Sequence, residues 1–187
     1  MPRRRYIFDP PERFVAGTVG EPGDRTFFLQ ARDGGRVVSV VLEKVQVAVL
    51  ADRLNRLLDE LEQRGVTPPL PSPATDAEPL DEPIVEAFRA GTLTLGWDGA
   101  ADRVLVEARA RSEDDEEEEV AEQELLDDGS PDGPDIFRVR LTAPAARAFV
   151  ERAVRVVSSG RPPCPLCGQP LDPQGHICPR RNGHYVN

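Results

Sequence analysis

Apolar residues follow one pattern twice along this chain, and that repetition limits the folds that the chain can adopt. In the first copy they alternate with polar residues over 12–20, 25–32 and 36–42, which predicts three strands. Residues 33–35 (DGG) supply the positive φ angles of a tight hairpin between the second and third strands. The apolar period then lengthens from two residues to 3.6, which predicts an amphipathic helix over 46–64.

The second copy repeats the first in composition and in order. Residues 88–94 (FRAGTLT) echo residues 14–20 (FVAGTVG), and residues 136–141 take the place of the third strand. A second helix is predicted from Thr142, a residue suited to an N-cap, to the break at Gly160. We therefore predict an internal duplication of a strand-strand-strand-helix unit.

A unit of about 55 residues with three strands and one helix is marginal in isolation, so the two copies are expected to pack together. The predicted fold class is α+β: six antiparallel strands, as one sheet or a partly closed barrel, with two helices covering apolar faces and a small zinc ribbon after them. The predicted parts are a first half at 1–65, a proline-rich linker at 66–83, a second half at 84–160 with an acidic insert at 113–135, and a tail at 161–187.

The linker contains six prolines within 66–83 and shows no apolar periodicity. Proline-rich segments of this kind are extended and carry few side chains that could be buried. We therefore predict a solvated connection between the two halves.

The tail holds every cysteine and histidine of the chain. Two cysteines separated by two residues form a tight knuckle whose thiolates can bind one tetrahedral ion. The predicted zinc ligands are Cys164, Cys167, Cys178 and His184, with His176 as the alternative fourth ligand. Four protein ligands close the coordination shell, which is typical of a structural zinc site. A redox role for the first two cysteines is the alternative.

The formal charge of −10 is unevenly distributed. Residues 113–135 contain thirteen acids and no base, so the rest of the chain carries +3. The acidity therefore belongs to the insert, which is expected to be a solvated loop, and total charge is a weak argument against nucleic-acid binding. Among the 23 basic residues Lys44 is the single lysine, a bias that we attribute to GC-rich codons.

Strand alternation places several arginines beside the insert. The candidate anion-binding residues are Arg109, Arg111, Arg138 and Arg140 on one exposed hairpin face, together with Arg180 and Arg181 of the tail. We hypothesise that the insert screens the hairpin face and competes with an anionic ligand. Deletion of 113–128 would then increase binding of RNA, DNA or polyphosphate.

The sequence contains no glycine-rich phosphate loop, no G-x-S-x-G and no H-E-x-x-H motif. No catalytic residue is therefore predicted, and the question of enzymatic activity stays open with a non-catalytic role preferred. Three clustered cysteines favour a reducing cytoplasm, and neither a signal peptide nor a membrane span is expected. A protein partner is expected, a contact with nucleic acid is left open, and no oligomeric state is predicted.

Five segments carry a family resemblance: residues 13–20, 25–32, 42–54, 91–98 and the tail from 164 to 184. Together they resemble an actinobacterial family of a domain of unknown function (DUF3090-like). The resemblance covers nearly the whole chain, and the tail is its most specific part. Members of that family are encoded near a histidine-phosphatase-like protein and a kinase-like protein, which implies an accessory role but transfers no catalytic residue.

Three functional hypotheses follow from these observations. The first is a non-catalytic binding or adaptor protein with a structural zinc site. The second is an accessory enzyme or subunit that acts on a phosphorylated ligand through the strand arginines. The third is a nucleic-acid-associated factor that uses the tail arginines.

Overall fold

A computed structural model describes residues 2–69, 74, 76–112, 131–160 and 164–166, and the backbone alone of residues 120–122. Its elements are β1 (Arg5–Phe8), β2 (Arg13–Val19), β3 (Thr26–Asp33), β4 (Arg36–Leu42), α1 (Lys44–Gln63), β5 (Glu86–Asp98), β6 (Arg103–Ala110), β7 (Val120–Glu122), β8 (Ile136–Leu141) and α2 (Ala143–Ser158). Within the described residues neither helix combines the length and the apolar character that a membrane crossing requires.

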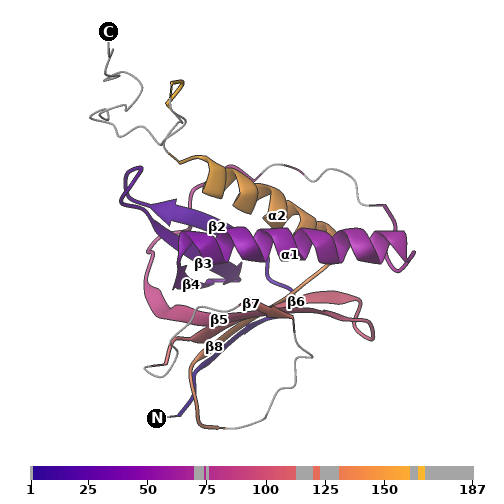
Figure 1. Cartoon of the computed structure of the whole chain (residues 1–187). Coiled ribbons are helices and arrows are strands. Elements are labelled where there is room, and N and C mark those ends of the chain that lie inside the picture. The colour runs from indigo at the N-terminus through magenta and orange to yellow at the C-terminus, as the bar shows by residue number, and fades with distance from the viewer. Residues whose placement is uncertain are drawn as a thin grey trace.

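The strands form one mixed sheet in the described part of the chain, and both helices lie over the same side of it (Figure 1). The strand order is β1-β8-β6-β5-β4-β3-β2, and β7 pairs with β5 off this path. The predicted α+β class is confirmed. The prediction of an all-antiparallel sheet is wrong, because β1 with β8, β4 with β5 and β5 with β7 pair in parallel.

The order of elements agrees with the predicted units. Antiparallel β2, β3 and β4 precede α1. A second set, in which β6 pairs antiparallel with both β5 and β8, precedes α2. The two sets lie side by side through the parallel β4–β5 pair, while β1 and β7 were not among the predicted strands. The internal duplication itself stays a prediction, since a repeated order of elements is not evidence of common origin.

The sheet is strongly curved because its two edge strands are neighbours in sequence. Only residues 9–12 separate Phe8 of β1 from Arg13 of β2, and such a link reaches at most about 18 Å. The edges of a flat sheet of this width would lie about 29 Å apart. Curvature also brings the ring of Phe14 in β2 to 6.3 Å from the ring of Phe137 in β8. The first and last strands of the sheet therefore lie closer together than they would in a flat sheet.

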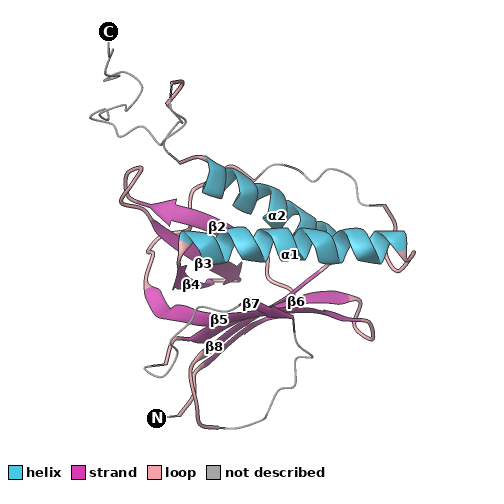
Figure 2. Ribbon diagram, in the orientation of Figure 1, coloured by secondary structure: helices cyan, strands magenta, loops and turns pink. Residues whose placement is uncertain are grey.

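The main core lies between the concave face of the sheet and the helices (Figure 2). Leu50, Leu54 and Leu58 of α1 have no exposed surface, and Phe149 of α2 stacks on Phe14 with ring centroids 4.6 Å apart. Full burial of such a side chain contributes about 1.5–3 kcal/mol relative to its exposure. The two helices are held on the sheet mainly by this apolar face.

Local capping positions the ends of both helices. The hydroxyl of Thr142 accepts a hydrogen bond from the backbone N–H of Ala145 at 3.3 Å, so the predicted N-cap of α2 is confirmed. The side chain of Gln46 accepts a hydrogen bond from the backbone N–H of Glu43 at 2.9 Å. The Thr142 contact fixes the start of α2, and the Gln46 contact fixes the start of α1. The candidate site lies at the start of α1.

A second, smaller core covers the outer face of β2, β3 and β4. Leu80 is buried there against Val15, Phe28 and Val41. Residues 76–84, here called the strap, cross this face without forming a helix or strand. The proline-rich connection was predicted to be solvated, and five of the nine strap residues are exposed, but Leu80 and the carboxylates of Asp76 and Asp81 hold the strap against the sheet.

Candidate functional site

Two adjoining cavities lie at one end of the helix layer, where α1 begins and α2 ends. The larger measures about 590 Å³ and is lined by Pro22, Gly23, Arg25, Phe27, Lys44, Val156, Val157, Ser158 and Gly160. The smaller measures about 310 Å³ and is lined by Arg25, Thr26, Phe27, Val41, Leu42, Glu43, Lys44 and Arg89. Because three residues line both, we treat them as one site, the basic cavities.

Arg25, at the start of the β3 hairpin arm, connects the cavities to the end of α2. Its Nη1 donates hydrogen bonds to the carbonyl oxygen of Ser159 at 2.8 Å and to the Ser159 hydroxyl at 3.3 Å. A cation at this position satisfies the free carbonyl groups and the negative end of a helix dipole. Among the described residues the buried Nε of Arg25 has no hydrogen-bond partner. A buried donor in this state is exceptional in folded proteins.

Lys44 is the first residue of α1, and its side chain is exposed. Within the described part of the chain its ammonium makes no ion pair. A Cβ built on Gly160 would lie 3.4 Å from the Lys44 Nζ. The Lys44 ammonium thus lies beside the end of α2.

Arg89 of β5 closes the smaller cavity. Its Nη1 lies 2.7 Å from the Oε1 of Glu43, and both side chains are about half exposed. Counted over the residues that the structure describes, the basic cavities hold three cations (Arg25, Lys44 and Arg89) and one carboxylate. The N-terminus of α1 and the C-terminus of α2 carry opposite partial charges of about one half, so the helix ends nearly cancel. The side chains leave the site with a net positive charge of two.

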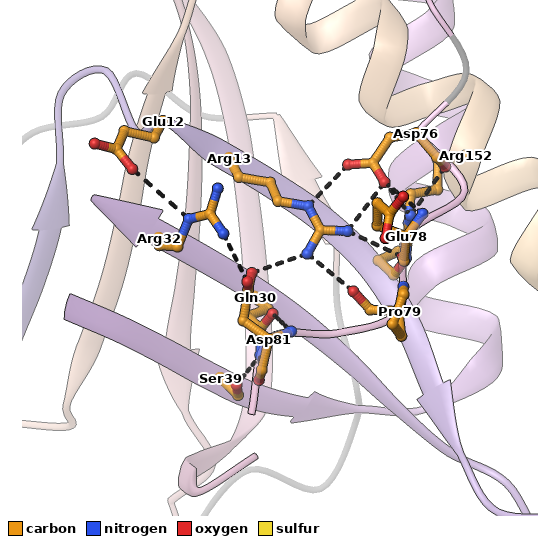
Figure 3. A network of polar contacts seen from close by, with 11 residues as sticks. Glu12, Arg13, Gln30, Arg32, Ser39, Asp76, Glu78, Pro79, Asp81 and Arg152 are labelled. Atoms are coloured by element: carbon orange, nitrogen blue, oxygen red, sulfur yellow. Dashed lines mark hydrogen bonds and ion pairs between the residues drawn. The ribbon is translucent and has the colours of Figure 1, made fainter. Parts of the chain in front are cut away.

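A second polar cluster fastens the strap to the body, and its charges are matched (Figure 3). Arg13 of β2 lies between two aspartates of the strap, 2.8 Å from Asp76 and 2.8 Å from Asp81. Arg32 of β3 contacts Asp81 at 2.7 Å, and Arg152 of α2 contacts Asp76 at 2.6 Å. The strap therefore joins two strands and a helix through one ion-pair network.

The network also uses backbone groups and a buried amide. Arg152 donates from Nε to the carbonyl oxygen of Ala16 at 2.8 Å, on the edge strand β2. Gln30 donates to the Ser39 hydroxyl and to the Asp81 carbonyl, each at 3.0 Å, and its Oε1 accepts from the Asp81 N–H at 2.7 Å. These polar groups satisfy one another, which is typical of a structural network.

Titration of the strap carboxylates follows from these contacts. The hydrogen bond from Arg13 and the charges of Arg13 and Arg152 lower the pKa of Asp76 below its ordinary value, against the opposing effect of burial. Burial raises the pKa of Asp81, but the hydrogen bonds and charges of Arg13 and Arg32 outweigh it, so the net shift is also downward. Both carboxylates are therefore held in their charged form.

The predicted hairpin arginines surround a buried acid. Glu107 of β6 has no exposed surface, and its two carboxylate oxygens accept hydrogen bonds from Arg109 and Arg138, each at 2.7 Å. The prediction that Arg138 lies on an exposed face is wrong, because it is buried opposite this carboxylate. Arg140 lies 3.2 Å from Asp9.

Arg111 follows the end of β6, and its backbone N–H donates to the carbonyl oxygen of Arg89 at 2.9 Å. The other two candidate arginines, Arg180 and Arg181, lie outside the described residues. Anion binding by any of these arginines stays a prediction.

Of the predicted zinc ligands the structure describes one. Cys164 is buried, forms no disulfide and lies four residues after the cavity-lining Gly160. The other predicted ligands, Cys167, Cys178, His184 and the alternative His176, lie outside the described residues. Within the described part no group of three or more metal-binding side chains occurs. The zinc site stays a prediction.

The basic cavities were not predicted because their cations come from three distant elements, β3, α1 and β5. One signal was present in the sequence. The only lysine of the sequence lies two residues before the predicted start of a helix, and we attributed it to codon usage. Lys44 lines both cavities, and codon usage does not explain this position.

Comparison with known proteins gives one match. The family model described as "Protein of unknown function (DUF3090)" matches residues 6–178. No curated protein and no solved structure matches the chain.

Proposed function

Because the chain belongs to the DUF3090 family of proteins of unknown function, we propose its role from its own geometry: it is a binding or adaptor protein that holds a small ligand in the basic cavities. The observation that carries the proposal is a concave site of about 590 Å³ with cations in its wall, within the usual range of ligand pockets. The strand arginines support this role less well, since Arg109 and Arg138 already donate hydrogen bonds to the buried carboxylate of Glu107.

The tail is the second part of the proposal. We propose that Cys164, Cys167, Cys178 and His184 bind one structural zinc ion, because three thiolates and an imidazole are the donor set that zinc prefers. The buried position of Cys164 supports an ordered attachment of the tail beside the cavities. The zinc-bound tail would then present a surface to a partner protein next to the bound ligand.

Filling the cavity tests the ligand site. Ser158 is exposed and lines the larger cavity, so Ser158→Trp places a large side chain at its mouth without removing a core residue. Native mass spectrometry of protein incubated with a small-molecule extract should detect a retained compound on the natural protein and little or none on the variant. Val85→Trp, at a position 67% exposed and away from the cavities, is the control and should retain the compound. Equal retention by all three proteins would refute the ligand site.

Elemental analysis tests the metal site. Reduced protein should contain one zinc ion per chain, and Cys164→Ser or His184→Ala should lower both the zinc content and the thermal stability. His176→Ala is the matched control and should retain zinc. Zinc loss in His176→Ala with retention in His184→Ala would assign the fourth ligand to the alternative histidine, and zinc-free natural protein would refute the site.

A further inference from the structure

The chemistry of the basic cavities indicates the class of ligand. Resting on the proposed ligand site, we infer that the ligand is a phosphorylated small molecule whose phosphate is bound by Lys44, Arg89 and Arg25. Its organic part occupies the larger cavity. Neither the family description nor the predicted anion-binding residues include this site.

The first argument is the imbalance of charge. Among the described residues three cations meet one carboxylate in the cavities, whereas the three arginines of the strap network face three carboxylates, those of Asp76, Asp81 and Glu12. Glu21 and Asp24, the acids of the neighbouring turn, line neither cavity. A phosphate carries up to two negative charges near neutral pH, so it would neutralise the excess.

The second argument is that hydrogen-bond donors of Lys44 and Arg25 lack partners in the described part of the chain. The Lys44 ammonium has three hydrogen-bond donors and makes no ion pair within the described residues. Arg25 uses Nη1 on Ser159, and its buried Nε is left without a partner in the same part of the structure. An unpartnered donor is exceptional in folded proteins when it is buried, as the Arg25 Nε is, whereas the exposed Lys44 ammonium can bind a ligand directly. Phosphate oxygens accept several such bonds at once.

The third argument is that the two cavities differ in lining: the smaller is mainly charged and the larger has an apolar wall. The smaller cavity is lined by Arg25, Glu43, Lys44 and Arg89, which suits the charged group of a ligand. The larger adds an apolar wall from Val156 and Val157 of α2, and the ring of Phe27 is shared by both cavities. A binding site of this kind fixes orientation through the polar end and gains affinity through the apolar end. Inorganic phosphate alone would leave the apolar wall empty.

Glu43 gives the site a built-in competitor. Its carboxylate lies 2.7 Å from Arg89, where a phosphate oxygen would bind. Both side chains are about half exposed, so exchange of this weak ion pair for a doubly charged phosphate is expected to be favourable. Glu43→Gln should therefore tighten phosphate binding.

Isothermal titration of the full-length protein with inorganic tripolyphosphate at low ionic strength tests the inference. Lys44→Gln should weaken binding about tenfold, Lys44→Arg should retain most of it, and Glu43→Gln should strengthen it. Arg56→Gln removes one charge from an exposed position of the same helix, 73% exposed, and should leave binding unchanged. Equal losses in Lys44→Gln and Arg56→Gln would indicate diffuse attraction and overturn the inference.

The two proposals fail in different ways. If the natural protein retains a neutral compound that Ser158→Trp loses, while tripolyphosphate does not bind, the ligand site stands and the phosphate assignment is overturned. If tripolyphosphate binding disappears in Lys44→Gln and in Ser158→Trp but persists in Arg56→Gln, both are supported. An acidic peptide that binds in place of a phosphorylated compound, with the same dependence on Lys44, would overturn the assignment to a small molecule.

Discussion

The strap network and the basic cavities use the same side-chain type for different purposes. Around the strap, three arginines meet three carboxylates, those of Asp76, Asp81 and Glu12, together with backbone carbonyls, and most of these groups lie at least partly out of solvent. In the cavities, three cations meet one half-exposed carboxylate. Matched and shielded charge stabilises a fold when its partners are complete, whereas unmatched charge at a concave surface is available to a ligand. The comparison predicts that variants in the strap network lower stability with little effect on ligand binding, and that variants in the basic cavities lower ligand binding with little effect on stability.

The largest effect on stability is expected from Arg13→Ala. The substitution leaves Asp76 and Asp81 without their shared cation. Removal of one partner of a buried ion pair costs about 3–5 kcal/mol, and the partial exposure of both aspartates reduces this to about 2–3 kcal/mol. Urea unfolding measures the loss, with Arg56→Ala as a control that changes stability by less than about 0.5 kcal/mol. Tripolyphosphate binding should persist, and its loss would show that the two sites are not independent.

An effect of about 2 kcal/mol is expected from the small core beneath the strap. Leu80→Ala removes most of a buried side chain there. A Cβ on Gly17 would lie 2.5 Å from the Leu80 Cδ2, so Gly17→Ala should cost about 1–2 kcal/mol by overpacking. The double variant should be more stable than the sum of the two losses implies, because the shorter side chain leaves room for the new methyl group. Strict additivity in urea unfolding would contradict the close packing of the strap on β2.

A smaller effect is expected from pH. The folded-state pKa values of Asp76 and Asp81 lie below their ordinary values, so their contribution to stability is complete above the unfolded pKa of about 4. That contribution is lost as the pH falls through the lowered folded-state values. Unfolding free energy measured from pH 6 to pH 2.5 should therefore fall less steeply in Asp76→Asn than in the natural protein. Identical slopes would mean that the strap does not depend on this carboxylate.

The smallest effect on stability is expected from Lys44→Gln. Lys44 is exposed and makes no ion pair in the described part of the chain, so its removal should change the unfolding free energy by less than about 0.5 kcal/mol. The same variant should show the tenfold loss of tripolyphosphate affinity. A large loss of stability would place Lys44 among the structural cations and remove the contrast between the two sites.

Local sequence pattern predicted the elements whose side chains repeat with a regular period. The strands of both units and both helices have such a period, and Thr142 has the chemistry of a helix cap. β1 was missed because it has only four residues and follows a run of arginines. The parallel β4–β5 pair was missed because the sequence does not indicate which edge strand of the first unit pairs with which edge strand of the second. That pairing depends on how the two units pack together.

The strap and the basic cavities could not be predicted for a related reason. Leu80 is a single apolar residue among prolines and acids, so no period marks its burial. Arg13 and Asp76 are 63 residues apart in sequence, and the cations of the cavities lie on three elements. The sequence therefore shows which charged side chains the chain carries. Contacts between residues that are distant in sequence decide which of these charges form ion pairs.

The curvature of the sheet has a consequence for encounters between copies of this chain. An open sheet edge presents unpaired N–H and C=O groups that recruit strands from other molecules and begin aggregation. Here the carbonyl of Ala16 on β2 accepts from Arg152, and the carbonyl of Ile7 on β1 accepts from Arg36 at 3.4 Å. An arginine from elsewhere in the fold thus occupies one acceptor on each terminal strand, and neither of these two carbonyl groups is available to a strand from another molecule.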